Sequence, residues 1–231
     1  MTTSAELGTV IVTGGASGLG AAVAAAVREA GGTPVVLDLK PPDTDHAYVE
    51  MDLADTRATE AAVAQVASTY GDLRAVVTCA GTDACGALDQ VSGEAWDRVL
   101  AVNLLGTAAV VRAAVGPLRA THGRIVTIGS TLGLRPAGDA TAYCASKHGI
   151  VGFSRALAME LAGQVGVTMV VPGGMQTHFF DGRPEQYRPG PDADLMDPAH
   201  VATAVVGALR QPAGVELREV IVTASTEPSW P

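Results

Sequence analysis

Short apolar runs rich in β-branched residues alternate along the chain with longer stretches of helical periodicity. The apolar runs predict buried strands at residues 9–13, 35–38, 46–51, 73–78, 124–130, 166–171 and 219–223. The stretches between them predict helices at residues 21–30, 56–69, 94–114, 143–161 and 198–209. Strands that alternate with helices form a parallel sheet covered on both faces. We therefore expect an α/β fold, a doubly wound parallel sheet of about seven strands in a single domain over residues 1–231.

Composition narrows the class of protein. The chain has 231 residues, of which 48% are hydrophobic, enough for one large core. Its formal charge of −9, without any basic run, argues against a nucleic-acid partner. Cys79, Cys85 and Cys144 form no C-x-x-C pair, which favours free thiols in a reducing compartment.

The N-terminal residues lack the basic and apolar regions of a signal peptide. The most apolar helical stretch that we identify, Leu19–Val27, ends at Arg28 and is too short to span a bilayer. We therefore expect a cytoplasmic protein without a membrane partner.

A glycine-rich turn directly follows the first predicted strand. Gly14, Gly18 and Gly20 have the spacing G-x-x-x-G-x-G, and the helix predicted at residues 21–30 follows this turn. Glycines let backbone N–H groups and the helix N-terminus approach a pyrophosphate. The order of strand, turn, helix and strand, with Asp38 at the end of the second strand, predicts a dinucleotide site. The alternative is a tight turn that binds nothing.

Asp38 bears on the choice of dinucleotide. A carboxylate at this position can accept hydrogen bonds from both hydroxyls of the adenosine ribose and repels a 2′-phosphate. Ser17 in the turn brings no positive charge, although Lys40 lies nearby in the sequence. We favour NAD over NADP, and the alternative for Asp38 is an ordinary polar residue at a strand end.

Two further stretches are candidates for cofactor contacts. Asp52 either contacts the adenine amino group or caps the helix predicted at 56–69, and the sequence favours neither. Ala80-Gly81 follows the fourth strand, where small residues let the backbone lie close to a cofactor.

Tyr143 and Lys147 are the main candidates for chemistry. Residues i and i+4 share one face of a helix, so the phenol and the ammonium are expected to be neighbours. The pKa of free tyrosine is about 10, and a fixed positive charge lowers it. A phenol with a pKa closer to neutrality can exchange the proton of an alcohol. The alternative is an exposed pair.

Ser130 and Asn103 are the other two candidates. Ser130 lies at the carboxyl end of the fifth strand, where its hydroxyl can donate to a substrate oxygen, or it is simply a turn serine. Asn103 lies inside the helix predicted at 94–114, where asparagine competes for backbone hydrogen bonds and can create a kink that frees a carbonyl for water. The sequence alone favours an ordinary amide on the helix surface.

Residues 184–198 are rich in proline, glycine and acids and lack periodicity, which is typical of a loop that covers a site. We call residues 178–197 the substrate loop. Gly133–Arg135 and the residues after Gly81 are also expected to contribute to specificity. Residues 226–231 are expected to be a surface tail or a contact between subunits.

Together these motifs resemble, over essentially the whole chain, the short-chain dehydrogenase/reductase family, in the single-domain branch with a Tyr-x-x-x-Lys active site. The matching elements are Thr13-Gly14 with Gly18 and Gly20 (T-G-x-x-x-G-x-G), the acid Asp38, the adenine-contacting pair Asp52-Leu53, the tetrad Asn103, Ser130, Tyr143 and Lys147, and Pro172-Gly173 with Thr177 (P-G-x-x-x-T). One departure is Thr78-Cys79, where the family commonly has two asparagines.

The resemblance implies a Rossmann fold and hydride transfer between a nicotinamide cofactor and a secondary alcohol or ketone. It implies that Tyr143 is the general acid–base, that Lys147 binds the nicotinamide ribose and lowers the pKa of Tyr143, that Ser130 polarises the substrate oxygen and that Asn103 holds a water. The cofactor contacts that it implies are Thr13, Gly14, Ser17, Gly18, Leu19, Gly20, Asp38, Asp52, Leu53, Ala80, Gly81, Tyr143, Lys147, Pro172, Gly173 and Thr177.

Two alternatives and the assembly stay open at this point. The alternatives are a 3-oxoacyl thioester reductase and a non-catalytic NAD-binding sensor or scaffold. No metal is expected. The resemblance also implies a homodimer or homotetramer, in which Ala156, Ala202 and Val205 pack between subunits or belong to the core.

Overall fold

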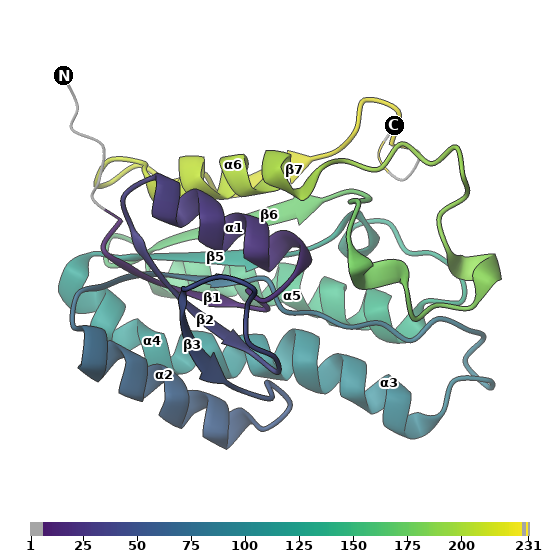
Figure 1. Cartoon of the computed structure of the whole chain (residues 1–231), viewed down its shortest axis with the longest axis horizontal. Helices are drawn as coiled ribbons and strands as arrows, with labels where there is room; N and C mark the ends of the chain where they lie inside the picture. Colours follow the sequence, from purple (N-terminus) through teal and green to yellow (C-terminus); the bar gives the residue numbers. More distant parts are fainter. Residues whose placement is uncertain (1–6, 228–229, 231) are drawn as a thin grey trace.

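A seven-stranded parallel sheet forms the centre of the structure, a computed structural model that describes residues 7–227 and Trp230 (Figure 1). The strands are β1 (Thr9–Thr13), β2 (Thr33–Asp38), β3 (Ala47–Glu50), β4 (Leu73–Thr78), β5 (Arg124–Ile128), β6 (Gly166–Pro172) and β7 (Glu219–Val222). Their order is β3-β2-β1-β4-β5-β6-β7. The strand order reverses between β1 and β4, which opens a crevice at their carboxyl ends. The predicted fold class, a doubly wound parallel sheet in a single domain, is confirmed.

Helices cover both faces of this sheet. They are α1 (Gly18–Glu29), α2 (Thr56–Tyr70), α3 (Gly93–Leu100), α4 (Thr107–Thr121), α5 (Thr141–Glu160) and α6 (Pro198–Leu209). α1 and α6 lie on one face, and α2, α4 and α5 lie on the other (Figure 1). Alternate side chains of β1 enter the two cores, Val10 and Val12 on the side of α1 and Ile11 on the side of α2. A strand buried on both faces explains the uninterrupted apolar run in the sequence.

The segment after β4 contains one continuous helical run rather than the helix predicted at 94–114. α3 and α4 are joined by a π-helical turn over Ala101–Gly106. The predicted end at residue 114 is wrong, because α4 continues through Pro117 to Thr121. The fully buried Leu118 in this last turn packs into the core, and this packing outweighs the backbone hydrogen bond that proline cannot make.

The run Gly93–Thr121 is long and apolar enough to cross a membrane by length and composition alone. The view that Leu19–Val27 is the most apolar helical stretch is therefore wrong. Half of the apolar window is buried inside the structure, and α4 packs on the sheet through Val110, Val111 and Ala114. A core helix of an α/β domain has this same composition, so the feature is weak evidence for a membrane span.

Several smaller boundaries also differ from those predicted. α1 begins at Gly18, inside the glycine-rich turn, and β5 ends at Ile128, so Ser130 follows the strand instead of ending it. Ala202 and Val205 are buried in the core beside α1, which excludes them from a contact between subunits, whereas Ala156 is exposed.

Candidate active site

A cavity of about 880 Å³ lies along the carboxyl ends of the central strands. One end is lined by the glycine-rich turn together with Asp38 and Asp52, and the other by Ser130 and Tyr143. We call these the cofactor end and the substrate end. All residues predicted for the site line this cavity except Thr13 and Asn103, which are buried behind its wall.

The strand register assembles the cofactor end. Thr13 pairs with Leu37 of β2 and Thr78 of β4, so the residues that follow these strands meet at one edge. The Thr13 hydroxyl accepts a hydrogen bond from the Ala80 backbone at 3.2 Å. Thr13 thus braces the segment after β4 from behind, a positioning role rather than a contact with the cavity.

The glycines of the turn are required by close backbone packing. A Cβ atom on Gly20 would lie 2.1 Å from the Gly14 carbonyl oxygen, and one on Gly14 would lie 2.7 Å from Ala80 Cα. Gly14 and Gly18 also have positive φ angles, 68° and 50°. Ser17 makes no side-chain cap hydrogen bond, so its hydroxyl leaves the first N–H groups of α1 for another acceptor. This arrangement fits a pyrophosphate.

Asp38 is held firmly against this turn. Its Oδ2 atom accepts a hydrogen bond from Ala16 N at 3.0 Å, and Oδ1 accepts one from Lys40 N at 3.3 Å. The half-buried carboxylate lines the cavity directly after β2. The carboxylate therefore lies at the end of the second strand, as predicted from the sequence.

Asp52 is not the N-cap of α2. Asp55 has that role, since its side chain accepts from Ala58 N at 3.0 Å. Asp52 accepts from Ala54 N at 2.9 Å and from Arg98 Nη1 at 2.8 Å, and the hydrogen bond from Arg98 holds the pKa of Asp52 below its usual value. Arg98 also lines the cavity, and nothing in the sequence separates it from an ordinary surface arginine of a helix.

The loop after β6 and the start of α1 form the wall between the two ends. Pro172 and Gly173 line this wall, and the Thr177 side chain lies opposite Gly18, where an added Cβ atom would be 3.3 Å away. Leu19 and Leu53 add apolar surface.

Asn103 lies in the π-helical turn and is 1% exposed, so the expectation of a surface amide is wrong. Its Oδ1 atom accepts from Thr82 N at 2.8 Å, and Nδ2 donates to Thr82 O at 2.9 Å and to Ser146 Oγ at 3.0 Å. One buried amide thus joins the segment after β4 to α5. π-Helical turns frequently occur at functional sites.

Lys147 lies below Tyr143 on α5. Its Nζ atom is 5.6 Å from the centre of the Tyr143 ring and donates a 2.9 Å hydrogen bond to Ile128 O. Burial lowers the pKa of Lys147 to about 8, which leaves the ammonium predominantly charged at neutral pH.

The pKa of Tyr143 moves in the direction opposite to our expectation. Burial raises it to about 12, while a side-chain hydrogen bond with Ser130 lowers it only in part. Burial therefore outweighs the effect expected from the Lys147 ammonium, which lies 5.6 Å from the centre of the ring. The hydrogen bond nevertheless shows that the hydroxyls of Ser130 and Tyr143 converge.

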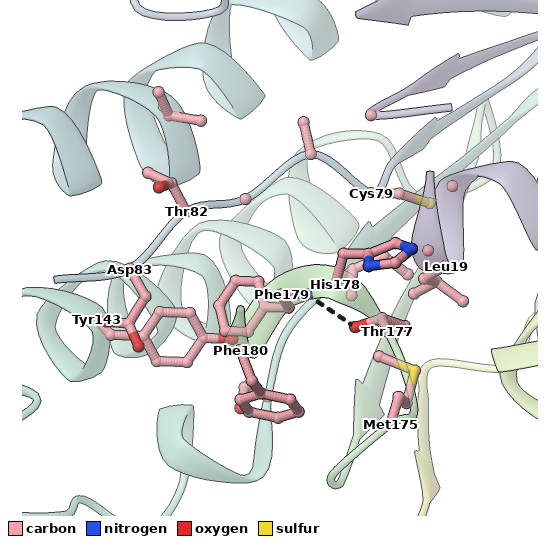
Figure 2. A pocket seen from close by; sticks show the side chains of 18 of the residues that line it. Leu19, Cys79, Thr82, Asp83, Tyr143, Met175, Thr177, His178, Phe179 and Phe180 are labelled. Atoms are coloured by element: carbon pink, nitrogen blue, oxygen red, sulfur yellow. Dashed lines mark hydrogen bonds between the residues drawn. The ribbon is translucent and has the colours of Figure 1, made fainter. Parts of the chain in front are cut away.

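The substrate end is closed by side chains from distant segments. The Phe179 ring lies 5.7 Å from the Tyr143 ring, and Figure 2 shows Phe179 and Phe180 on the same side of the pocket as Tyr143. Arg183 forms a 2.5 Å ion pair with Asp83, from the segment after β4. The substrate loop was predicted to contribute here, but the pairing of its Arg183 with Asp83 was not, since nothing in the sequence couples residues so far apart.

Two expectations about neighbouring segments are wrong in part. Thr131 and Leu132 line the cavity, whereas Gly133–Arg135 pack away from it.

The stretch 226–231, expected to be a surface tail, folds back on the site as far as it is described. Glu227 lines the cavity and accepts from Gly174 N at 2.9 Å, and Trp230 lies 4.7 Å from the Arg135 guanidinium carbon. Residues 228, 229 and 231 lie outside the described residues.

Among residues 7–227 and Trp230, no three His, Cys, Asp or Glu side chains are grouped closely enough to hold a metal ion.

The fold and the site define the class: an α/β protein with a doubly wound parallel sheet, a glycine-rich turn at one end of its cavity, and a buried serine and lysine beside a half-buried tyrosine at the other. The family model for short chain dehydrogenases matches residues 8–188, and the chain belongs to this family. It is an oxidoreductase that acts on alcohol or ketone groups.

Curated relatives and solved structures agree with this placement. The 2,5-dichloro-2,5-cyclohexadiene-1,4-diol dehydrogenase of Sphingobium indicum is 30% identical over 85% of this chain and 86% of its own. The D-beta-hydroxybutyrate dehydrogenase of Rhizobium meliloti is 33% identical over 78% and 76%. The ligand-free aldohexose dehydrogenase of Thermoplasma acidophilum, at 23% identity, superposes with a TM-score of 0.84 over 96% of this chain and 95% of its own, which shows the shared fold.

Proposed function

We propose that this protein transfers a hydride between NAD and a secondary alcohol or ketone, with Tyr143 as the general acid–base. The observation that carries the proposal is the convergence of Ser130, Tyr143 and Lys147 at one end of a cavity whose other end is the glycine-rich turn. The relatives named above act on a diol and a hydroxy acid, so their names support a carbinol as the reacting group.

The residues of the cofactor end fit a dinucleotide. The close backbone packing at Gly20 and the uncapped N-terminus of α1 offer donors to a pyrophosphate. The carboxylate of Asp38 favours ribose hydroxyls over a 2′-phosphate, which supports NAD. When bound, the cofactor supplies the hydride chemistry, and the protein supplies orientation and electrostatics.

The protonation of Tyr143 decides which proton transfer the phenol is ready to perform. With a pKa of about 12, the phenol is protonated at neutral pH, which is the form that donates a proton to a ketone oxygen. Alcohol oxidation needs the phenolate, so it requires more positive charge beside the phenol than Lys147 provides here. Ser130 orients the substrate oxygen, and Asn103 positions the segment that forms the wall.

The direct test is a screen of secondary alcohols and ketones with NAD(H) and NADP(H), following the absorbance of the reduced nicotinamide. We expect turnover with at least one carbinol and faster turnover with NAD(H). Cofactor binding without turnover of any compound would favour a non-catalytic sensor or scaffold instead.

Asp38→Ala tests the choice of cofactor. Because the change removes the carboxylate that repels a 2′-phosphate, we expect the ratio of kcat/KM for NADP to that for NAD to rise by ~10-fold or more, the scale of a lost charged hydrogen bond. Asp43→Ala, in the exposed loop that follows, is the matched control and should leave the ratio unchanged. A wild-type protein that prefers NADPH would contradict the assignment of Asp38.

Three further expectations belong to the proposal. The substrate loop, residues 178–197, selects the small-molecule substrate. The protein assembles as a homodimer or homotetramer, with the outer face of α5, where Met159 is 81% exposed, as a contact surface. It works in the cytoplasm, without nucleic-acid or membrane partners.

A further inference from the structure

The ion pair between Asp83 and Arg183 is buried directly beside the proposed acid–base. The Asp83 side chain is 5% exposed and that of Arg183 is 18% exposed. Both charges act on the pKa of Tyr143, Asp83 raising it and Arg183 lowering it. Figure 2 shows Asp83 next to Tyr143. The pair is thus part of the chamber in which a carbinol would meet Tyr143.

Both partners of the pair are fixed by other contacts. The Arg183 guanidinium lies over the rings of Phe179 and Phe180, at 5.2 and 4.6 Å from their centres, and Nη1 donates to Tyr187 O at 3.3 Å. Asp83 also accepts from the Cys85 thiol at 3.1 Å. Burial raises the pKa of Cys85 to about 12, so this thiol adds no charge. Neither charge can turn toward a ligand without breaking these contacts.

Every positively charged or titratable nitrogen group on the described lining of the cavity already has an oxygen partner. The pairs are Arg98 with Asp52, Lys147 with Ile128 O, His178 with Asp181 and Arg183 with Asp83. An anion buried beside Tyr143 would have to compete with Asp83 for the Arg183 guanidinium, of which only the buried Nε has no hydrogen-bond partner among the described residues, and this competition is unfavourable in a site screened from water.

We propose that the Asp83–Arg183 pair determines the charge of the substrate: the chamber accepts carbinols with neutral surroundings and rejects those with a carboxylate, sulfonate or phosphate next to the reacting group. This inference rests on the proposed function, because it concerns the substrate of the same site. Asp83 acts by neutralising Arg183, so removing its charge frees a guanidinium for an anion.

A matched pair of compounds tests the inference, namely 1,3-butanediol and 3-hydroxybutyrate, which share a carbon skeleton and a secondary carbinol. With NAD⁺, we expect kcat/KM of the wild type to favour the diol by ~10-fold or more. Where turnover is too slow to measure kcat/KM, the dissociation constants of the two compounds from the NAD⁺-loaded protein are compared instead. In Asp83→Asn, the ratio of hydroxybutyrate to diol should rise by at least ~10-fold.

Three control variants distinguish an effect of charge on this ratio from a disturbance of the fold. Asp43→Asn makes the same change at an exposed position away from the cavity and should not alter the ratio. Asp83→Asn with Arg183→Gln removes both charges and should abolish the gain. If Asp83→Asn does not fold, as judged by its Tm, Arg183→Met takes its place and should increase the discrimination against hydroxybutyrate.

The outcomes are distinct from those for the proposed function. An active wild type that prefers hydroxybutyrate, or a folded Asp83→Asn protein without a gain for the anion, overturns the inference and leaves hydride transfer intact. An NAD-bound protein that turns over no carbinol contradicts the proposed function instead.

Discussion

The two ends of the cavity are built in different ways. The cofactor end is made largely by backbone, and its glycine-rich turn and Asp38 come from one unbroken stretch of β1, α1 and β2. The substrate end is made by side chains from separate segments, such as the pair of Asp83 with Arg183 and the contact of Phe179 with Tyr143. Backbone geometry constrains the first end, and side-chain charge and shape constrain the second. Substitutions at the cofactor end should therefore act through the backbone, and substitutions at the substrate end through the charge and shape of the side chain.

The largest effect that separates the two ends is expected from Gly20→Ala. The new methyl group would lie 2.1 Å from the Gly14 carbonyl oxygen, so either the turn or α1 must move. We expect a loss of ~3 kcal/mol in the free energy of unfolding and of about 100-fold in NAD affinity. Urea unfolding and cofactor titration measure these effects.

Gly116→Ala is the matched control, on the exposed face of α4 with nothing within 4 Å of the added Cβ. It should stabilise the protein by ~0.5–1 kcal/mol and leave NAD affinity unchanged. If the two substitutions had equal effects on the free energy of unfolding and on NAD affinity, close backbone packing would not be what forms the cofactor end.

A smaller effect is expected from Asn103→Ala, at the join between the two ends. The change removes the partners of Thr82 N and Thr82 O and of the Ser146 hydroxyl inside the core. We expect a loss of ~2 kcal/mol in the free energy of unfolding, the usual scale for unsatisfied buried groups. Leu105→Ala, in the same π-helical turn but 53% exposed, should change it by only ~0.5 kcal/mol or less. A thermal melt in which both variants behave alike would contradict the buried role of Asn103.

The smallest effect is a pH dependence caused by Lys147. Burial lowers its pKa in the folded protein from 10.5 to about 8, so between these values the unfolded chain binds more protons. The free energy of unfolding should therefore rise with pH, relative to a Lys147→Met variant, by about 1 kcal/mol per pH unit. Urea unfolding of both proteins at pH 8 and pH ~9.5 measures this difference, because Tyr143, Cys79 and Cys85, whose raised pKa values oppose the trend, are present in both proteins. A difference between the proteins that does not change with pH would mean that Lys147 is not desolvated.

The same contrast explains how much the sequence could predict. The sheet, the glycine-rich turn and Asp38 were predictable, because each depends on local residue types at fixed spacing. The convergence of Ser130 with Tyr143 followed from the rule that parallel strands present their carboxyl ends at one edge.

The remaining features depend on tertiary contacts that leave no local signal. Asn103 reads as a surface amide because the π-helical turn that buries it is not visible in the spacing of apolar residues. The spacing of Tyr143 and Lys147 predicts a lowered pKa of the phenol, but burial, which depends on the whole fold, raises it instead. The partners Asp83 and Arg183 are separated by β5, α5 and β6 along the chain, so only the fold couples them.

The single most direct measurement is the kcat of Tyr143→Phe with the best carbinol and NAD⁺, together with the NAD⁺ dissociation constant. The account predicts a fall of ~10²-fold or more in kcat, because the proton acceptor is lost, with NAD⁺ affinity nearly intact. Tyr70→Phe, at the exposed end of α2, should retain full activity. Wild-type turnover by Tyr143→Phe would contradict the account.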